Sequence, residues 1–292
     1  MTCSQSNKEI HSEIEKILDT KILASFRVSG GDINETYRLK LSQGTVFLKT
    51  NTRAPKDLFQ AEAKGLKWLS ETKAIRVPKV LGVSSPQSPI PFLILEELEF
   101  TPPTEKFGIQ LGRALANQHR LTSARCGLDH NNYIGTLPQM NTPHPNWLTF
   151  YREYRLLPQI TAAVRANRIN SKLEKDLKSL LNRLGDHIPT APPLSRLHGD
   201  LWSGNYACIS RDTPVIFDPA AYAGDREIDI AMMILFGHIP SQTLAAYNQS
   251  WPLPKGWQER VKLYQLYPLL VHVNLFGDSY ANSVSESIRP YI

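Results

Sequence analysis

The sequence predicts an α+β fold with two lobes, a small β-rich N-terminal lobe with one main helix and a larger α-helical C-terminal lobe. Strand-like segments gather in the first hundred residues, and helical periodicity dominates the rest. The 292 residues are 41% hydrophobic and 21% charged, which suits a globular chain with a sizeable core. We place the boundary so that the N-lobe is residues 1–98 and the C-lobe residues 99–292.

The N-lobe is predicted to begin with an amphipathic helix over Glu9–Thr20, because isoleucines and a leucine recur there at helical spacing. A second helix is predicted over Leu58–Ser70. Five strands, forming an antiparallel sheet, are predicted around these helices, at 25–30, 36–41, 45–50, 77–83 and 91–98.

The C-lobe is joined to this sheet near residues 97–101 and is predicted to be mostly helical. The expected helices are 105–119, 147–160, 171–184, 240–249 and 258–276, with another beginning after Asp225. Two short strand-like pieces, at 195–198 and 214–217, interrupt the helical pattern.

Composition excludes several classes of protein. The cysteines, Cys3, Cys126 and Cys208, are too far apart for a disulfide framework or a zinc site. No apolar run reaches the roughly 20 residues of a membrane span, and the polar N-terminus lacks the apolar core of a signal peptide. We therefore expect a cytoplasmic protein with no membrane partner.

The formal net charge of +6 and the pI of about 9.1 suit a polyanionic ligand such as ATP, and also nucleic acid. Lys and Arg are scattered rather than clustered, and basic stripes interleaved with aromatic residues are missing from the sequence. A solvated surface explains the charge, and nucleic acid is not an expected partner.

The segment HGDLWSGN, residues 198–205, is the strongest functional signal. Asp200 is followed five positions later by Asn205, a spacing typical of a kinase catalytic loop. In that interpretation Asp200 accepts the proton of the attacking hydroxyl, and Asn205 offers its side-chain oxygen to Mg²⁺. The alternative is that both residues cap a glycine-containing turn.

Asp218 follows the apolar run 214–217, and a carboxylate at the end of a buried strand is costly unless it is paired or bound to a cation. Its place after Asn205 is where kinases carry their main Mg²⁺ ligand. Taken alone, Asp218 also suits a turn, and the neighbouring loop favours the metal-binding interpretation.

Lys49 ends a strand pattern and is a candidate for contact with the α- and β-phosphates of ATP. Glu62, on the following predicted helix, is well placed to hold it. Without the other motifs, both residues would be ordinary solvated surface groups.

Weaker nucleotide-binding candidates lie on either side of this strand. Gly30, Gly31 and Asn34 belong to a turn whose backbone N–H groups would cover phosphates, although the turn does not fit GxGxxG. At the end of the fifth strand, Glu96, Glu97 and Leu98 would offer backbone groups to adenine.

Two carboxylates after Asp218 have structural interpretations. Asp225 is expected to cap the following helix, and Asp229 to brace the catalytic loop.

The strings LHGDLWSGN and PVIFDPAAYAGDREIDIAMM, with SGGDINETYRL, VFLK and the C-terminal AYNQSWPLPKGWQERVKLYQLYPLLVHVNLFG, resemble the fructosamine kinases (ketosamine-3-kinases) over nearly the whole chain. The resemblance implies a protein-kinase-like fold. It also implies Mg²⁺-dependent transfer of the γ-phosphoryl group of ATP to the O3 hydroxyl of a ketosamine sugar. The acceptor would be a ribulosamine, erythrulosamine or fructosamine, free or on a glycated protein lysine, and the role deglycation repair.

The resemblance also implies roles for individual residues. It assigns the catalytic base to Asp200, the Mg²⁺ ligands to Asn205 and Asp218, and the phosphate-binding pair to Lys49 and Glu62. Trp202 is the candidate to stack on the sugar, or else packs within the loop. The segment SGGDINET contains no cysteine, so the redox regulation of some family members is not expected here.

Other functions remain open on the sequence. One is a related kinase with an aminoglycoside or choline as acceptor, and another is an inactive nucleotide-binding scaffold. The sequence does not determine the oligomeric state.

Overall fold

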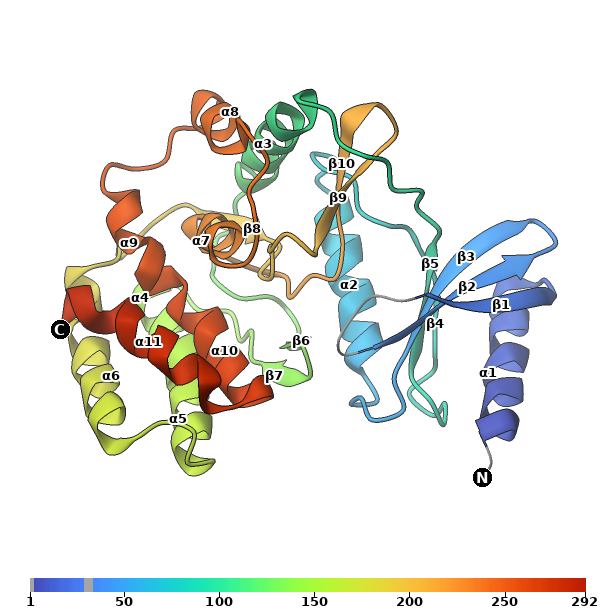
Figure 1. The fold of residues 1–292 in the computed structure, drawn as a ribbon, viewed down its shortest axis with the longest axis horizontal. Helices are drawn as coiled ribbons and strands as arrows, with labels where there is room; N and C mark the ends of the chain where they lie inside the picture. The colour runs from blue at the N-terminus through green and yellow to red at the C-terminus, as the bar shows by residue number, and fades with distance from the viewer. Residues whose placement is uncertain (1–2, 29–33) are drawn as a thin grey trace.

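The computed structural model describes residues 3–28 and 34–292 and confirms the predicted α+β fold class. Two lobes lie side by side, a sheet-containing lobe and a larger helical one (Figure 1). The division at residue 98 stays a prediction, although the chain does leave the sheet after Glu96 and enters the first helix of the larger lobe at Lys106.

The N-lobe is built on a five-stranded antiparallel sheet of order β1-β2-β3-β5-β4. Its elements are α1 (Cys3–Leu18), β1 (Ile22–Val28), β2 (Glu35–Leu41), β3 (Gly44–Thr50), α2 (Leu58–Ser70), β4 (Val80–Val83) and β5 (Phe92–Glu96).

Successive side chains of a strand point to opposite faces of the sheet, and apolar side chains lie on both faces here. A helix covers each face. Leu48 and Ile94 pack with Ile14 of α1. On the other face, Leu93 packs with Leu66 of α2 in a core that continues into the C-lobe. Because α2 lies between the sheet and the C-lobe, a side chain on its inner surface can reach the junction of the lobes.

The C-lobe contains helices and three two-stranded β pieces within the described residues. Its elements are α3 (Lys106–His119), β6 (Asn132–Ile134), β7 (Leu137–Gln139), α4 (Trp147–Phe150), α5 (Leu157–Arg165), α6 (Ser171–Arg183), β8 (Leu194–Leu197), β9 (Tyr206–Ile209), β10 (Thr213–Ile216), β11 (Tyr222–Asp225), α7 (Glu227–Leu235), α8 (Thr243–Ser250), α9 (Trp257–Tyr264), α10 (Leu266–Phe276) and α11 (Ala281–Ile288).

Two helices that the periodicity predicts as continuous are divided. The segment 147–160 comprises α4, a π-helix over Tyr151–Leu156, and the start of α5. Pro158 lacks the N–H that an α-helix would direct to the carbonyl of Tyr154, and its ring clashes with that carbonyl, which favours the wider helix. The segment 258–276 divides at Gln265, and Pro268 lies in the first turn of α10, where a missing N–H is tolerated.

Short elements escaped the sequence analysis, namely β6, β7, β9, β11 and α11. The β pieces have three or four residues each, so they contain too little alternation to be recognised before pairing.

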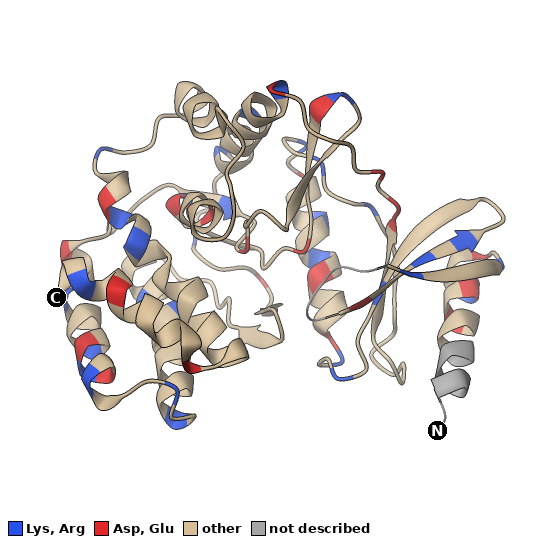
Figure 2. Ribbon diagram, in the orientation of Figure 1, with Lys and Arg blue, Asp and Glu red and all other residues tan. Residues whose placement is uncertain are grey.

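Charge of both signs alternates along outer helices such as α6, where Lys172 pairs with Asp176 and Lys178 with Glu174 (Figure 2). This pattern is typical of a solvated surface. In the part of the chain that the structure describes, helices that combine the length and apolarity of a membrane span are absent.

Candidate active site

The segment His198–Asn205 connects β8 to β9 at the junction of the lobes. β8 pairs with β11, so this loop lies against the chain that follows Asp218. Gly199 has a φ of +83°, and a Cβ there would be 2.1 Å from the carbonyl oxygen of Ala220. Only glycine fits this position, which brings the two segments into contact.

Asn205 fixes the shape of this loop. Its Nδ2 donates to the carbonyl oxygen of Asp200 at 2.8 Å and to Oδ2 of Asp200 at 3.1 Å. The amide oxygen Oδ1 is thereby left on the other side of the side chain, available to a cation. A backbone hydrogen bond joins the end of this loop to the residue that follows β10: the N–H of Phe217 donates to the carbonyl of Asn205 at 3.0 Å.

Asp218 follows β10 and has a φ of +58°, in the left-handed region that costs a non-glycine residue about 1 kcal/mol. Strain of this kind persists where the surroundings hold it and is frequent at functional sites. Its carboxylate is about half exposed, and Oδ1 accepts a hydrogen bond from Nζ of Lys49 at 2.8 Å.

Lys49, at the end of β3, is buried and joins the lobes. Its Nζ also donates to Oε1 of Glu62, on α2, at 2.8 Å. Burial alone would lower the pKa of Lys49, but the carboxylates of Asp218 and Glu62 outweigh it and raise the pKa above its ordinary value. Lys49 is therefore held as a cation facing the catalytic loop.

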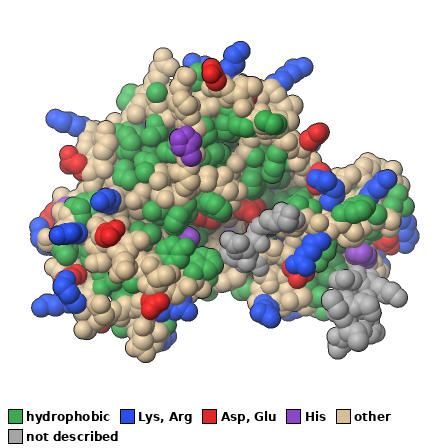
Figure 3. Space-filling model, viewed as in Figure 1, with side chains coloured by type: hydrophobic (Ala, Val, Ile, Leu, Met, Phe, Trp, Pro, Cys, Tyr) green, Lys and Arg blue, Asp and Glu red, His purple; other side chains and the backbone are tan. Residues whose placement is uncertain are grey.

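The carboxylates of the site repel one another. Burial, reinforced by the negative charge of Asp218, raises the pKa of Asp200 to about 7, although the hydrogen bond from Asn205 opposes the shift. Burial also raises the pKa of Glu62, against the effect of Lys49. Acidic side chains are visible in the hollow between the lobes (Figure 3). A bound cation would relieve this repulsion.

Asp229, on α7, is fully buried and holds the start of the loop, the bracing role that the sequence predicts for it. Its carboxylate accepts the N–H groups of His198 at 2.7 Å and Gly199 at 2.9 Å. Burial would raise the pKa of Asp229, but the hydrogen bond from His119 lowers it below the ordinary value. Asp225 accepts the N–H of Glu227 at 3.0 Å at the start of the same helix.

His198, the first residue of the motif, connects two segments of the site. Its Nε2 bonds the carbonyl of Phe217 at 2.8 Å, while Nδ1 accepts the N–H of Asp200 at 3.2 Å. Burial lowers the pKa of His198, in keeping with a neutral ring that carries its hydrogen on Nε2. One imidazole thus spans the segments bearing Asp200 and Asp218. Its position before the Gly-Asp pair was the signal available in the sequence.

Three other candidates that the structure describes, Glu96, Glu97 and Asn34, bond to residues outside this cluster. The side chain of Glu96 pairs with Arg76 and that of Glu97 with Arg38, while their backbone groups and Leu98 lie where the chain leaves β5. Asn34 accepts a hydrogen bond from Asn51 at 3.1 Å.

Gly30 and Gly31 lie outside the described residues.

Trp202 is 37% exposed, and its indole lies over Gly204, where a Cβ would be 2.2 Å from the ring. The ring therefore both packs within the loop and presents an apolar surface beside Asp200.

The donor set suits Mg²⁺. Among the described residues, clusters of three or more His, Cys, Asp or Glu side chains able to hold a metal are absent. The amide oxygen of Asn205 and the carboxylate of Asp218 are instead the sparse oxygen set with which Mg²⁺ is held when phosphates and water complete the coordination.

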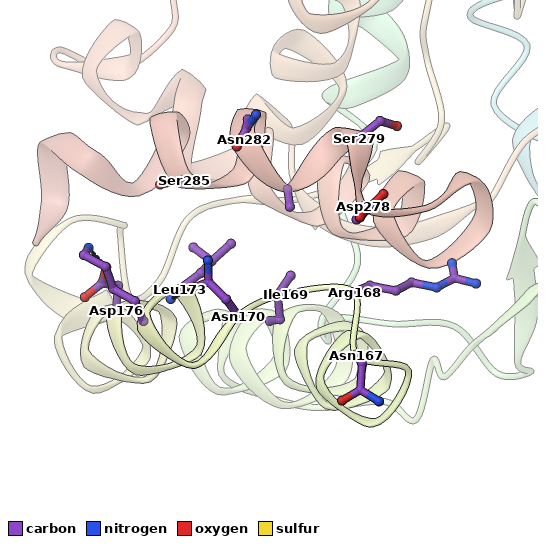
Figure 4. Close-up of a pocket in the computed structure, with 12 residues that line it drawn as sticks. Asn167, Arg168, Ile169, Asn170, Leu173, Asp176, Asp278, Ser279, Asn282 and Ser285 are labelled. Carbon is purple, nitrogen blue, oxygen red and sulfur yellow. Dashed lines mark hydrogen bonds and ion pairs between the residues drawn. The ribbon is translucent and has the colours of Figure 1, made fainter.

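A pocket of about 580 Å³ lies elsewhere, between the start of α6 and the segment that enters α11 (Figure 4). It is lined by polar groups such as Asn170 and Asn282 and contains none of the candidate site residues.

Comparisons with known proteins identify the family of this chain. The family model described as fructosamine kinase matches residues 5–292. A "probable ketoamine kinase" of Enterococcus faecium is 40% identical over 267 residues, which cover 90% of this chain and 94% of the relative. A second, from Synechocystis, is 38% identical over 265 residues, covering 90% and 88%.

Solved structures share the fold of this chain. One described as a "putative fructosamine-3-kinase" from Thermobifida fusca superposes with a TM-score of 0.88 at 33% identity, covering 96% of this chain and 97% of the other. An aminoglycoside phosphotransferase superposes with a TM-score of 0.66 at 14% identity, covering 98% and 99%, a likeness of fold alone. The chain belongs to the fructosamine kinase family and is an ATP-dependent phosphotransferase with an alcohol group as acceptor.

Proposed function

We propose that this protein transfers the γ-phosphoryl group of ATP to the O3 hydroxyl of the sugar of a ketosamine. The observation that carries the proposal is the bonded cluster of Lys49, Glu62 and Asp218, lying beside the Asp200–Asn205 loop. The cluster supplies a cation for the phosphates and one oxygen ligand for a metal. The loop supplies a second oxygen ligand and a carboxylate for the acceptor hydroxyl, and these groups together suit phosphoryl transfer.

In this proposal Lys49 binds the phosphates of ATP. Its cationic form is secured by the flanking carboxylates, and Glu62 keeps it at the junction of the lobes. ATP lies between the lobes, with adenine against the backbone of Glu96–Leu98. Asn205 and Asp218 would hold Mg²⁺, which would neutralise the charge that develops on the phosphoryl oxygens.

Asp200 is the proposed base. A carboxylate whose pKa is near 7 in the absence of metal accepts a proton more readily than an ordinary aspartate does. Its Oδ2 is held by Asn205, so Asp200 can orient the sugar hydroxyl and take its proton as the new P–O bond forms. The bond between the γ-phosphorus and the β,γ-bridging oxygen breaks in the same transfer, and ADP leaves with that oxygen. Positioning and electrostatics would supply most of the rate.

The proposed acceptor is a ribulosamine, an erythrulosamine or a fructosamine, free or on a glycated lysine, and the proposed role is removal of glycation. Trp202 supports a sugar acceptor, because its exposed indole offers a flat apolar surface to sugar C–H groups. The family membership supports the ketosamine.

The test is Mg²⁺-dependent ATP consumption with the three ketosamines, an aminoglycoside and choline, for the wild type and Asp200→Asn. We expect turnover on at least one ketosamine and a loss of about 10²- to 10⁴-fold in kcat for the variant, with ATP affinity retained. Asp186→Asn, which changes an exposed carboxylate that pairs with Arg183 at the surface, is the matched control and should keep wild-type rates.

Turnover only on an aminoglycoside or choline would contradict the proposed acceptor. Mg·ATP binding without turnover on any of these acceptors would favour the scaffold alternative. Full activity in Asp200→Asn would exclude Asp200 as the base.

A further inference from the structure

Arg155 is a buried cation that the proposed mechanism does not use. Its side chain is fully buried, and its hydrogen bonds within the described residues all go to neutral oxygens: the carbonyls of Met140 at 2.7 Å and Tyr154 at 3.0 Å, and Oδ1 of Asn141 at 2.6 Å. Its guanidinium lies 3.9 Å from the ring centroid of Tyr222. Burying a charge is costly, so a guanidinium here needs a reason beyond filling space.

The π-helix determines where this guanidinium points. Pro158 supplies no N–H to the carbonyl of Tyr154, and Nη1 of Arg155 donates to that oxygen. Short π-helical segments are rare and occur frequently at functional sites. The π-helix and the buried guanidinium are therefore linked, because Arg155 supplies the donor that Pro158 cannot supply.

A chain of buried amides begins at Arg155. Nδ2 of Asn141 donates to Oδ1 of Asn132 at 2.8 Å, and Nδ2 of Asn132 donates to the carbonyl of Ala221 at 2.8 Å. Gln139 donates from Nε2 to the same Oδ1 of Asn132 at 2.8 Å and to the carbonyl of Ala220 at 3.0 Å. The three amide side chains are all at most 4% exposed.

Arg155 constrains the direction of this chain of hydrogen bonds at its first member, Asn141. A guanidinium has donors only, so Asn141 must turn its oxygen toward Arg155 and its NH₂ toward Asn132. Asn132 must then present its oxygen to Asn141, which leaves its NH₂ for Ala221. The carbonyl oxygens of His130 and Ala221, which accept from Asn141 and Asn132, require the same orientation, so the cation and these carbonyls together leave each amide one arrangement.

The chain ends beside the proposed metal site. Ala220 and Ala221 follow Asp218 by two and three residues, and the carbonyl of Ala220 lies against Gly199, next to Asp200. Asp218 adopts a left-handed φ that its surroundings must maintain.

We propose that Arg155 is a positioning residue, which acts through Asn141, Asn132 and Gln139 to hold residues 218–221 in the backbone conformation that aims Asp218 at Mg²⁺. The inference rests on the proposed function, in which Asp218 is a metal ligand. Outer groups of this kind set the orientation of metal ligands and contribute strongly to metal affinity.

The sharpest variant is Asn141→Asp. A carboxylate still accepts from Arg155, and pairs with it, but cannot donate to Asn132, so the chain is cut without removing the cation's partner. Gln139→Met is a second variant that removes the anchor of Ala220 and leaves Arg155 untouched. Tyr151→Phe is the matched control, because it lies on the same π-helix, is fully buried, and loses only a hydroxyl that bonds the carbonyls of Leu263 and Tyr264.

Calorimetry with ADP, in excess Mg²⁺ and in EDTA, is the measurement, together with thermal unfolding. We expect both chain variants to bind Mg·ADP about tenfold more weakly than the wild type and metal-free ADP equally well. Tyr151→Phe should bind both forms like the wild type, whatever its melting temperature.

Unchanged Mg·ADP affinity in a folded chain variant would overturn the inference. Equal losses for metal-free ADP and Mg·ADP would also overturn it, because they would show a structural role alone. A wild type that binds ADP but gains nothing from Mg²⁺ would instead contradict the proposed metal site itself.

Discussion

At the scale of single residues, the environment of a side chain decides its chemistry. Lys49 belongs to a strand and Glu62 to a helix 13 positions later, and either alone would be an ordinary surface residue. Burial against Asp218, 169 positions away in sequence, converts the pair into a fixed cation with two carboxylates. None of the three can be removed without leaving a buried charge less well compensated.

Lys49→Met should therefore lower kcat/KM for ATP by about 10²-fold or more, since it removes the cation from the phosphates and isolates Glu62. The double variant Lys49→Met/Glu62→Gln should be little worse than Lys49→Met, because Glu62 acts through Lys49. Steady-state kinetics of the two single variants and the double variant check this. Fully additive losses would show that Glu62 acts independently of Lys49.

The raised pKa of Asp225 leads us to expect that the free energy of unfolding depends on pH. Burial, and then the charge of Glu227, raise its pKa from 3.8 to about 6. A raised carboxyl pKa favours the folded state below pH 3.8, and this contribution is lost as the pH rises through about 6. Asp225→Asn does not titrate, so relative to the wild type it should gain about 2 kcal/mol of unfolding free energy between pH 4 and 7.

Urea denaturation of both proteins at about pH 4 and about pH 7 tests this expectation. The exposed Asp186→Asn variant is the control and should track the wild type at both values. A pH-independent difference between Asp225→Asn and the wild type would contradict the assignment.

At the scale of elements, close packing depends on positions without a side chain. Helices α3 and α8 approach through Gly108 and Gly112, one turn apart on α3. A Cβ at Gly112 would be 2.2 Å from the carbonyl oxygen of Thr243, and one at Gly108 1.9 Å from that of Ser241. Both contacts are with backbone, so neither can be relieved by rotating a side chain.

Gly112→Ala should accordingly destabilise the protein by about 1–3 kcal/mol, despite the higher helix propensity of alanine. Gly185→Ala is the matched control, because its Cβ would meet only the tip of Leu148 at 3.1 Å. Urea denaturation compares the two variants. Equal stability of Gly112→Ala and Gly185→Ala would contradict the close approach of α3 and α8 at Gly112.

At the scale of the whole molecule, the site exists only where the lobes meet. Lys49 of β3 pairs with Asp218, which follows β10, and the N–H of Ile216 donates to the carbonyl of Arg76 at 3.0 Å. A ligand bound between the lobes would add contacts to both of them. It would therefore stabilise the molecule as a unit.

Mg·ATP at a hundred times its dissociation constant should raise the unfolding free energy by about 3 kcal/mol. EDTA should remove most of this gain, and Lys49→Met nearly all of it. Thermal unfolding with ATP, with Mg·ATP and with Mg²⁺ alone is the measurement. A gain that persisted in Lys49→Met would place the nucleotide elsewhere.

The sequence by itself determined the fold class and the family. Local signals were sufficient for long elements, and α2 begins and ends at the residues that periodicity predicts. The spacing of Asp200 and Asn205 is likewise a local property, since one short loop carries both and a hydrogen bond between their side chains closes it.

Only the tertiary structure decided the rest, because it depends on contacts between segments distant in sequence. The π-helix, the buried Arg155 and its amides look like ordinary helix and loop residues until residues 130–141 and 218–223 are packed together. Similarly, the bracing of the loop by Asp229 requires His119 and α7 in place. Hydrophobic periodicity records which face of an element is buried, whereas the direction of a buried hydrogen bond is fixed only by its partner.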